Sequence, residues 1–452
     1  MFMNSNIIKI CIAIACAFSV YFFSRLWLNS EQSIALSLIC LLVILWSNNA
    51  LPLGVVSLLP ILLFPMFDLM PTNEVTSNYS KSIIFLFIGG FLLAIGVEKT
   101  QLHKVIANKI LQIFPHTVIG MIYALALTAG SLSAFLSNTT SCLLLMPLVL
   151  FLSDDDALKK RFALALCYGA SIGGIITPIG TPPNLILYGI FEQLQLPTIP
   201  FAQWIMLVLP LALIMFILLG WILSWGTKGK QLDRQQQETD HKLTIAQKKV
   251  ALVLVSLIIL LFANSPIQPY YPGLGINEKG LLLASGLVLF LPPINILNWL
   301  DSKKIPFEII FLFGAGFTIA AVFTSSGLAN QLAVFLQTFS QLPTPLLIIL
   351  IACLVTFSTE ITSNTALISM ILPVIYALCI QNGLDTRLLM MVATVCASYA
   401  FMLPIATPPN AIAISSGAIK ITSMMKYGLI LNLLGIILIS FFAYGYWRII
   451  LN

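Results

Sequence analysis

The sequence predicts an all-α polytopic membrane protein, and three observations support this fold class. Of the 452 residues, 59% are hydrophobic and only 8% are charged, and the mean hydropathy is +1.01. A soluble chain of this length needs far more charge to cover its surface. Apolar runs of about 17–25 residues, long enough for a helix to cross the hydrocarbon core, follow one another along most of the chain. Period-2 alternation is absent, which disfavours a transmembrane barrel.

The order of these runs predicts eleven crossings and two segments of a different kind. The crossings are expected at residues 7–28, 33–50, 51–70, 82–98, 162–191, 201–225, 250–264, 278–296, 306–324, 388–418 and 427–448. The apolar segments 117–152 and 344–381 each carry a polar cluster at their centre. One helix of about 36 residues would measure ~54 Å, whereas the hydrocarbon core is about 30 Å thick. We therefore favour re-entrant hairpins with buried polar tips over two full crossings each.

The chain also repeats itself at a constant offset. The Ser-Asn-Thr of residues 137–139 recurs at 363–365, and the Thr-Pro-Pro-Asn of 181–184 recurs at 407–410. Both offsets are 226, because 363 − 137 = 226 and 410 − 184 = 226. A constant offset over more than one motif indicates a duplicated structural unit. In a membrane protein, polar interruptions at matching positions in two halves are a strong pointer to a transport site.

The distribution of basic residues predicts the orientation of the chain. Whether each hairpin returns to its own side or crosses twice, the basic residues gather on one side, which is expected to be the cytoplasm. The N-terminus lies on that side too, and the crossing at 82–98 runs opposite to its partner at 306–324, so that the repeat is inverted. Residues 99–114 and 325–340 are expected to form interfacial helices. The basic cluster comprises Lys99, Lys104, Lys109, Lys159, Lys160, Arg161, Lys303, Lys304 and the polar loop 227–249.

The Thr-Pro-Pro motifs predict a break within each of the helices at 162–191 and 388–418. Proline removes a backbone N–H and clashes with the preceding turn, so a helix cannot continue through it. Thr followed by Pro also suits an N-cap and the first helical position. Each break therefore starts a second half-helix, as does each Ser-Asn-Thr tip. Four half-helix N-termini are expected to converge near the midplane, where oriented N–H groups and partial positive charge favour an anion.

The same breaks predict sites for a small hard cation. Unwound carbonyls, amide oxygens and hydroxyls are oxygen ligands, and the absence of Cys and His from the motifs argues against transition metals. Buried Ser, Asn and Thr can instead simply join helices. The duplication of both motifs at one offset favours a binding site. The candidate oxygen-bearing residues are Ser137, Asn138, Thr139, Ser363, Asn364 and Thr365, with Ser133 and Thr359 one helical turn earlier and the small residues Gly180 and Ala406 at the breaks.

Glu360 is an acidic residue within the second hairpin segment, and its repeat partner is Ala134. A carboxylate inside a membrane segment is by default a candidate functional residue. It is expected either to tune cation binding or take up a proton, or to be a neutralised or ion-paired structural group. The sequence leaves these roles open.

The paired Ser-Asn-Thr tips and Thr-Pro-Pro-Asn loops resemble those of the divalent anion/sodium symporters, the SLC13-type dicarboxylate carriers. Residues 400–412 look typical of bacterial members. The resemblance covers nearly the whole chain and implies a homodimer with about eleven transmembrane helices, two re-entrant hairpins, and scaffold and transport domains that move as an elevator. It implies this division: N-terminal scaffold helices at 1–81, a first repeat at 82–225, a cytoplasmic loop at 226–249, scaffold helices at 250–305 and a second repeat at 306–452.

The resemblance also implies roles for individual residues. The substrate carboxylates would be held by Ser137, Asn138, Thr139, Ser363, Asn364, Thr365, Thr407 and Pro408. One sodium ion would be held near Ser133, Ser137, Asn138 and Gly180, and a second near Thr359, Thr362, Asn364 and Ala406. The chain departs from the family pattern at Thr177-Pro178, where an extra proline precedes Gly180. This proline puts the geometry of the first sodium loop in question.

The resemblance implies the function: sodium-coupled import of C4 dicarboxylates such as succinate, malate and fumarate across the inner membrane of a bacterium. No Lys or Arg lies near the motifs, so bound Na⁺ would supply the charge that a buried dianion needs. No organic cofactor and no nucleic acid is expected. The alternatives are a sodium-independent exchanger and a sulfate or tricarboxylate carrier. An enzyme is disfavoured because Glu360 is the only acid available at depth, and a channel would not need an inverted pair of hairpins.

Overall fold

The structure, a computed structural model, describes residues 5–48, 50–227, 229–230, 232, 242–266, 270–335 and 342–451. Every regular element in this part of the chain is helical, which confirms the predicted all-α class. The first helices are α1 (Ser5–Ser24), α2 (Ser30–Asn48), α3 (Leu53–Met66), α4 (Thr72–Asn78), α5 (Ser82–Lys99) and α6 (Leu102–Ile113). The next are α7 (Val118–Ser133), α8 (Asn138–Leu152), α9 (Asp156–Gly174), α10 (Pro182–Gln193) and α11 (Phe201–Ser224).

The second part of the chain continues with helices of the same kind. These are α12 (Ile245–Asn264), α13 (Glu278–Val288), α14 (Phe307–Ser325), α15 (Leu328–Phe335), α17 (Thr344–Ile361), α18 (Asn364–Asn382), α19 (Thr386–Ala397), α20 (Pro408–Ser415) and α21 (Ile421–Phe442). Three short elements complete them: η1 (Trp299–Lys304), η2 (Ala443–Trp447) and α22 (Arg448–Leu451). Of the expected interfacial helix at 325–340, residues 336–340 lie outside the described residues, as do residues 228, 231 and 233–241 of the loop at 226–249.

Within the described residues, nine helical stretches are long and apolar enough to cross a membrane, against the eleven crossings expected. The difference has a local cause in proline and glycine. α3 has 14 residues and two internal prolines, and α13 has 11 residues and stops before Pro292 and Pro293. The stretches expected at 162–191 and 388–418 are each divided into two helices. Conversely, α17 and α18 were expected as two arms of one hairpin, but each is long and apolar enough to be counted among the nine stretches that could cross a membrane.

The two apolar segments with polar centres each form two helices joined by a short turn. α7 and α8, the first hairpin, meet at residues 134–137, and the Ser137 side chain caps α8 by accepting a hydrogen bond from the Thr140 N–H. α17 and α18, the second hairpin, meet at residues 362–363. The Ser-Asn-Thr motifs thus stand where a helix begins, since Ser137 and Ser363 are the N-cap residues of α8 and α18.

Each divided helix has an unwound segment at its centre. The first break, residues 175–181, separates α9 from α10, and the second break, residues 398–407, separates α19 from α20. Thr181 and Thr407 are the N-cap residues, and the prolines that follow them occupy the first helical positions, as expected where the missing N–H would be unpaired anyway.

Helices in the two halves begin at matching positions. α6 and α15, α7 and α17, α8 and α18, and α10 and α20 each start 226 residues apart, since 328 − 102, 344 − 118, 364 − 138 and 408 − 182 all equal 226. The sequence repeat is therefore also a repeat of helix boundaries.

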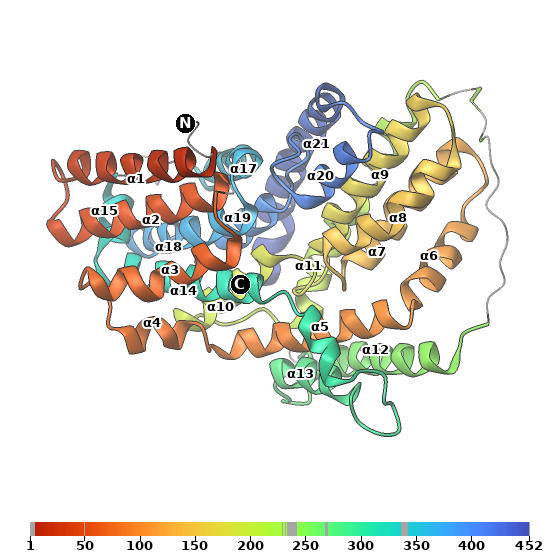
Figure 1. Cartoon of the computed structure of the whole chain (residues 1–452), viewed down its shortest axis with the longest axis horizontal. Helices are drawn as coiled ribbons and strands as arrows, with labels where there is room; N and C mark the ends of the chain where they lie inside the picture. The colour runs from red at the N-terminus through yellow and green to blue at the C-terminus, as the bar shows by residue number, and fades with distance from the viewer. Residues whose placement is uncertain are drawn as a thin grey trace.

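Two groups of helices lie on opposite sides of the view in Figure 1. α1, α2, α3, α14, α15 and α18 lie together at the left of the view, and α7, α8 and α9 lie together at the right. α7 and α9 cross with their backbones in close contact, because a Cβ placed on Gly173 would lie 2.2 Å from the Gly130 Cα. α5 and α13 approach in the same way, since a Cβ on Gly89 would lie 2.4 Å from the Leu282 carbonyl oxygen. Gly89 is thus a close-packing glycine.

Candidate functional site

A cavity of about 250 Å³ lies where the hairpin tips and the breaks meet. It is bounded on its other side by apolar side chains of α5 and α14, including Phe87, Phe91 and Phe313. No charged side chain of the described residues lines it. All eight residues predicted to hold substrate line this cavity: Ser137, Asn138, Thr139, Ser363, Asn364, Thr365, Thr407 and Pro408.

Four helices begin at the wall of the cavity. The first residues of α8, α10, α18 and α20 all line it, among them Asn138, Pro182, Asn364 and Pro408. The first-turn N–H groups of a helix have no partner within the helix and carry partial positive charge. The arrangement thus presents oriented N–H groups and side-chain hydroxyls to a space that no charged side chain of the described residues lines.

The first expected cation site is partly assembled in the structure. The Ser133 hydroxyl donates a hydrogen bond to Asn138 Oδ1. A Cβ placed on Gly180 would lie 2.4 Å from the Gly174 carbonyl oxygen, 2.9 Å from that of Ser133 and 3.1 Å from that of Ala134. Several carbonyl oxygens therefore surround the Gly180 Cα, and only glycine fits there.

Ser137, also expected at the first cation site, caps the start of α8. Its hydroxyl lies at the exposed tip, where it accepts from the Thr140 N–H at 3.1 Å and lies 2.8 Å from the Thr140 hydroxyl. The structure thus brings together Ser133, Asn138 and Gly180, and gives Ser137 the role of an N-cap at the cavity wall.

The second expected cation site has the same core contact. The Thr359 hydroxyl lies 2.5 Å from Asn364 Oδ1 and 3.0 Å from the Ala397 carbonyl oxygen. Ala406 lines the cavity beside Asn364. The Thr362 hydroxyl instead donates to the Ser358 carbonyl at 2.8 Å, so it is directed along its own helix.

The donor set of both sites fits a hard monovalent cation. Amide, hydroxyl and backbone carbonyl oxygens are the ligands present, and such oxygens suit hard cations. Among the described residues, no group of three or more His, Cys, Asp or Glu side chains could hold a metal ion, so nothing in them offers a transition-metal centre.

Glu360 lies behind the second break and does not line the cavity. Its carboxylate is 3% exposed and accepts hydrogen bonds from the N–H groups of Met402 and Leu403, both at 2.9 Å, and from Asn432 Nδ2 at 2.6 Å. The contact with Asn432 is possible because α21 packs closely on the break, where a Cβ on Gly428 would lie 2.2 Å from the Phe401 carbonyl oxygen. Glu360 therefore ties the second hairpin to the second break and to α21.

The first half makes the equivalent connection with different chemistry. Thr177, the repeat partner of Leu403, donates its hydroxyl to the carbonyl of Ala134, the repeat partner of Glu360. The unexpected Thr177-Pro178 sequence thus belongs to a contact that joins the first break to the first hairpin tip.

Two asparagines at the breaks, Asn184 and Asn410, were not among the predicted site residues. Both are fully buried, and each donates through Nδ2 to carbonyls of its own break. The signal was present in the sequence, because each asparagine is the fourth residue of a repeated Thr-Pro-Pro-Asn motif.

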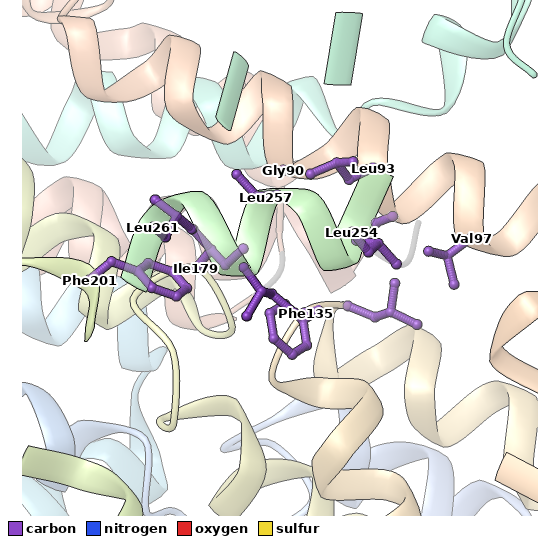
Figure 2. Close-up of a pocket in the computed structure, with 12 residues that line it drawn as sticks. Gly90, Leu93, Val97, Phe135, Ile179, Phe201, Leu254, Leu257 and Leu261 are labelled. Carbon is purple, nitrogen blue, oxygen red and sulfur yellow. The ribbon is translucent and has the colours of Figure 1, made fainter. Parts of the chain in front are cut away.

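The first hairpin tip and the first break face α5 and α12 across an apolar contact. Figure 2 shows Phe135 and Ile179 directed towards Leu93 and Val97 of α5 and towards Leu254, Leu257 and Leu261 of α12. The gap between them measures only about 20 Å³. No hydrogen-bonding side chain lines this gap, so the contact depends on shape and burial.

A polar contact joins α10 to α5 and α13 at the end of α10. Lys279 Nζ lies 2.8 Å from Glu192 Oε2, and the Ser82 hydroxyl donates to Glu192 Oε1 at 2.6 Å. Lys81 donates to Gln193 Oε1 at 2.8 Å. These five side chains form what we call the α10 latch.

Comparison with known proteins agrees with this geometry. The citrate transporter family matches residues 41–384 and, in an overlapping match, 282–451. The chain is 31% identical over 431 residues to the sodium-dependent dicarboxylate transporter SdcS of Staphylococcus saprophyticus, covering 88% of this chain and 83% of that protein. It is 30% identical over 441 residues to SdcS of Staphylococcus aureus strain NCTC 8325, covering 90% and 84% respectively.

A solved structure shares the fold. The crystal structure of the Alcanivorax borkumensis YdaH transporter, described as having an unusual topology, matches with a TM-score of 0.56 at 15% identity, covering 82% of this chain and 88% of that one. The family and the relatives are transporters and not enzymes. The chain is therefore an integral membrane transporter that belongs to the citrate transporter family, and the expected SLC13-type kinship is confirmed.

Proposed function

We propose that this transporter carries C4 dicarboxylates such as succinate, malate and fumarate into a bacterial cell, coupled to sodium ions. The observation that carries the proposal is the single cavity lined by both Ser-Asn-Thr tips and both Thr-Pro-Pro starts, without a fixed cation. The relatives' names, which describe sodium-dependent dicarboxylate transport, support it.

The proposed binding mode follows from the two-fold arrangement of the site. A dicarboxylate has two separated negative groups, and the cavity has two sets of helix N-termini and hydroxyls. Ser137, Asn138 and Thr139 would hold one carboxylate, and Ser363, Asn364 and Thr365 the other. Thr407 and Pro408 would contact the substrate from the second break.

Sodium ions would supply the charge that the cavity lacks. Transferring a dianion into a poorly hydrated space costs several kcal/mol per unpaired charge, and helix ends offset only part of it. One ion would bind near Ser133, Asn138 and Gly180, and a second near Thr359, Asn364 and Ala406. Because Asn138 and Asn364 would contact both an ion and the substrate, we propose that sodium binds first and orients both amides.

The movement that exposes the site to each side would be an elevator motion. The hairpins, the broken helices and α11 and α21 would form the transport domain, which moves against a scaffold that includes α5, α12, α13 and α14. The apolar contact in Figure 2 supports this division, since a surface free of hydrogen bonds can slide without breaking them. The hairpins would be re-entrant from opposite sides, the N-terminus cytoplasmic, and the assembly a homodimer.

The first experiment is uptake of labelled succinate into proteoliposomes with an inward Na⁺ gradient, against a K⁺ gradient of equal size. Accumulation with Na⁺ alone is the expected result. Uptake that ignores Na⁺ and requires internal dicarboxylate would contradict coupling and identify a sodium-independent exchanger.

A tricarboxylate carrier is the second candidate, and the citrate transporter family match favours it. Citrate is larger and carries one more carboxyl group. Competition of labelled succinate uptake by unlabelled citrate and sulfate separates the candidates, because the dicarboxylate proposal expects malate and fumarate to compete far better than either.

A further inference from the structure

Asn184 and Asn410 occupy equivalent positions in the two halves of the molecule. Each is the third residue of its half-helix, α10 or α20, and the two are 226 residues apart. Both are 0% exposed. Neither belongs to the residues proposed above to hold substrate or sodium.

Each asparagine bonds backward across its break. Asn184 Nδ2 donates to the Thr177 carbonyl at 2.9 Å, and Asn410 Nδ2 donates to the Leu403 carbonyl at 3.0 Å. Thr177 and Leu403 are themselves 226 residues apart, so the same bond is made twice. Asn410 also donates to the Ala400 carbonyl at 3.0 Å. The start of each second half-helix is thus joined to the unwound segment before it.

The orientation of both amides is determined by these bonds, and it leaves an oxygen unpaired. Turning either amide over would bring Oδ1 against a carbonyl oxygen, which is repulsive. In the present orientation, Oδ1 of Asn184 and Oδ1 of Asn410 are buried, and no donor among the described residues bonds them. An unpaired buried acceptor destabilises the fold, whereas an apolar side chain of similar size would fill the space without that loss. Both halves nevertheless have an asparagine at this position. This indicates that the hydrogen bonds donated by the Nδ2 groups are needed there.

Those bonds act on the backbone that surrounds the first proposed cation position. Asn184 Nδ2 donates to the Thr177 carbonyl, and the Thr177 hydroxyl donates to the Ala134 carbonyl. The Ala134 carbonyl oxygen is one of the oxygens close to Gly180. The path from the asparagine to the proposed ligands therefore has only two hydrogen bonds.

The second half has the equivalent path with an additional charged group. Asn410 holds the Leu403 carbonyl, and the Leu403 N–H donates to Glu360, which follows Thr359 in α17. Thr359 contacts Asn364. In each half, the residue whose carbonyl accepts from the asparagine, Thr177 or Leu403, thus also bonds to the adjacent hairpin.

We propose that Asn184 and Asn410 are positioning residues for sodium: each holds its break in the shape that brings the cation ligands together, without touching the ion. The inference rests on the proposed sodium coupling. It explains why a buried asparagine with an unpaired oxygen follows Pro-Pro in both halves.

The test is thermal unfolding of the purified transporter in detergent across a range of NaCl concentrations, with choline chloride keeping the ionic strength constant. The variants are Asn184→Leu and Asn410→Leu, which keep the volume and remove the donor. We expect each variant to raise the sodium concentration that gives half of the maximal stabilisation by at least about fivefold. This is the effect expected when one hydrogen bond that holds the break in its binding shape is lost.

Asn264→Leu is the matched control. Asn264 is also buried and holds a loop, since its Nδ2 donates to the Ile276 carbonyl and its Oδ1 accepts from the Ile276 N–H, both at 2.7 Å. The Asn264 amide bonds Ile276, between α12 and α13, and not the carbonyls of either break, although Asn264 borders one cavity with Pro178 and Ile179 of the first break. The control is expected to lower the unfolding temperature without sodium and to leave the half-saturating sodium concentration unchanged.

An unchanged half-saturating concentration in both Leu variants would overturn the inference, as would an equal shift in the Asn264→Leu control. If a Leu variant does not fold, Asn184→Ala and Asn410→Ala make the same measurement with a smaller side chain. A wild-type protein that sodium does not stabilise would instead overturn the proposed sodium coupling itself, so the two failures are distinguishable.

Discussion

The hydroxyl of Thr359 lies 2.5 Å from the amide oxygen of Asn364, and the same contact joins Ser133 to Asn138 in the first half of the chain. In each half, the residue one turn before the hairpin tip thus contacts the asparagine that opens the next helix. Both asparagines also line the cavity, so each connects a proposed cation position with the proposed substrate position.

Replacing Thr359 by Val keeps the shape of the side chain and removes the hydroxyl. We expect the sodium concentration for half-maximal uptake to rise about tenfold, because a proposed oxygen ligand and the contact that orients Asn364 are both lost. Thr318→Val is the control, since Thr318 is buried and its hydroxyl donates only to the Gly314 carbonyl of its own helix at 2.8 Å. An equal rise in both variants would mean that Thr359 acts only through stability.

Gly180→Ala introduces a methyl group where three carbonyl oxygens converge. The new Cβ would lie 2.4 Å from the Gly174 carbonyl oxygen, so the backbone of the first break must move. We expect sodium-dependent uptake to fall by about tenfold or more, since overpacking of this kind costs about 1–3 kcal/mol. In Gly280→Ala, where the closest atom would be 3.9 Å away, uptake should be unchanged. Normal uptake by Gly180→Ala would exclude this break from ion binding.

Glu360→Gln tests the structural role against proton uptake. The carboxylate accepts from two backbone N–H groups through its two oxygens, and a Gln amide would turn an NH₂ group towards one of them. We expect a loss of about 1–3 kcal/mol in the free energy of unfolding, seen as a lower unfolding temperature. The pH profile of uptake should keep its shape. A profile that becomes flat in the variant would show that Glu360 carries a proton during transport.

Glu192→Gln weakens the α10 latch, in which Glu192 contacts Lys279 and Ser82. If α10 moves against α5 and α13, this contact must break during transport, and its loss should speed substrate exchange by about two- to fivefold, as expected for a half-exposed ion pair. Glu98→Gln removes the pair with Lys304, at 3.2 Å between α5 and the segment before α14, both in the proposed scaffold. Exchange that accelerates equally in this control would contradict the proposed division of domains.

Asp301 gives a prediction for pH. The Asn298 N–H and the Lys99 ammonium, whose Nζ lies 2.7 Å from Asp301 Oδ2, lower the pKa of this carboxyl group. A lowered pKa stabilises the folded state above the unfolded pKa of about 3.9, and the contribution disappears as pH falls through the folded value. Asp301→Asn should therefore lower the free energy of unfolding at pH 7 by less than about 1 kcal/mol, and the difference should disappear as the pH falls below the lowered pKa. A difference that grows with acidity would contradict this assignment.

The breaks and the hairpin tips were predictable because their causes are local. Proline at 182 and 408 cannot continue a helix, and Ser137 and Ser363 favour an N-cap, so the helix starts at these points follow from the chain itself. The lengths of α3 and α13 were not predicted, because hydropathy does not distinguish a full crossing from a short helix that prolines or neighbouring helices end.

The sequence alone was enough to assign an all-helical membrane protein with a duplicated unit and two pairs of polar motifs, since apolar length, proline chemistry and a constant offset are properties of the chain. The folded structure added what depends on contacts between distant residues. It made Glu360 a tie between the second hairpin and the second break. It also determined the partners of side chains that bond close by in the chain, directing Thr362 to its own helix and the amides of Asn184 and Asn410 to their own breaks. The hydrogen-bond partner of a side chain depends on where the folded backbone places its carbonyl and N–H groups. Residue type and spacing alone do not determine that placement.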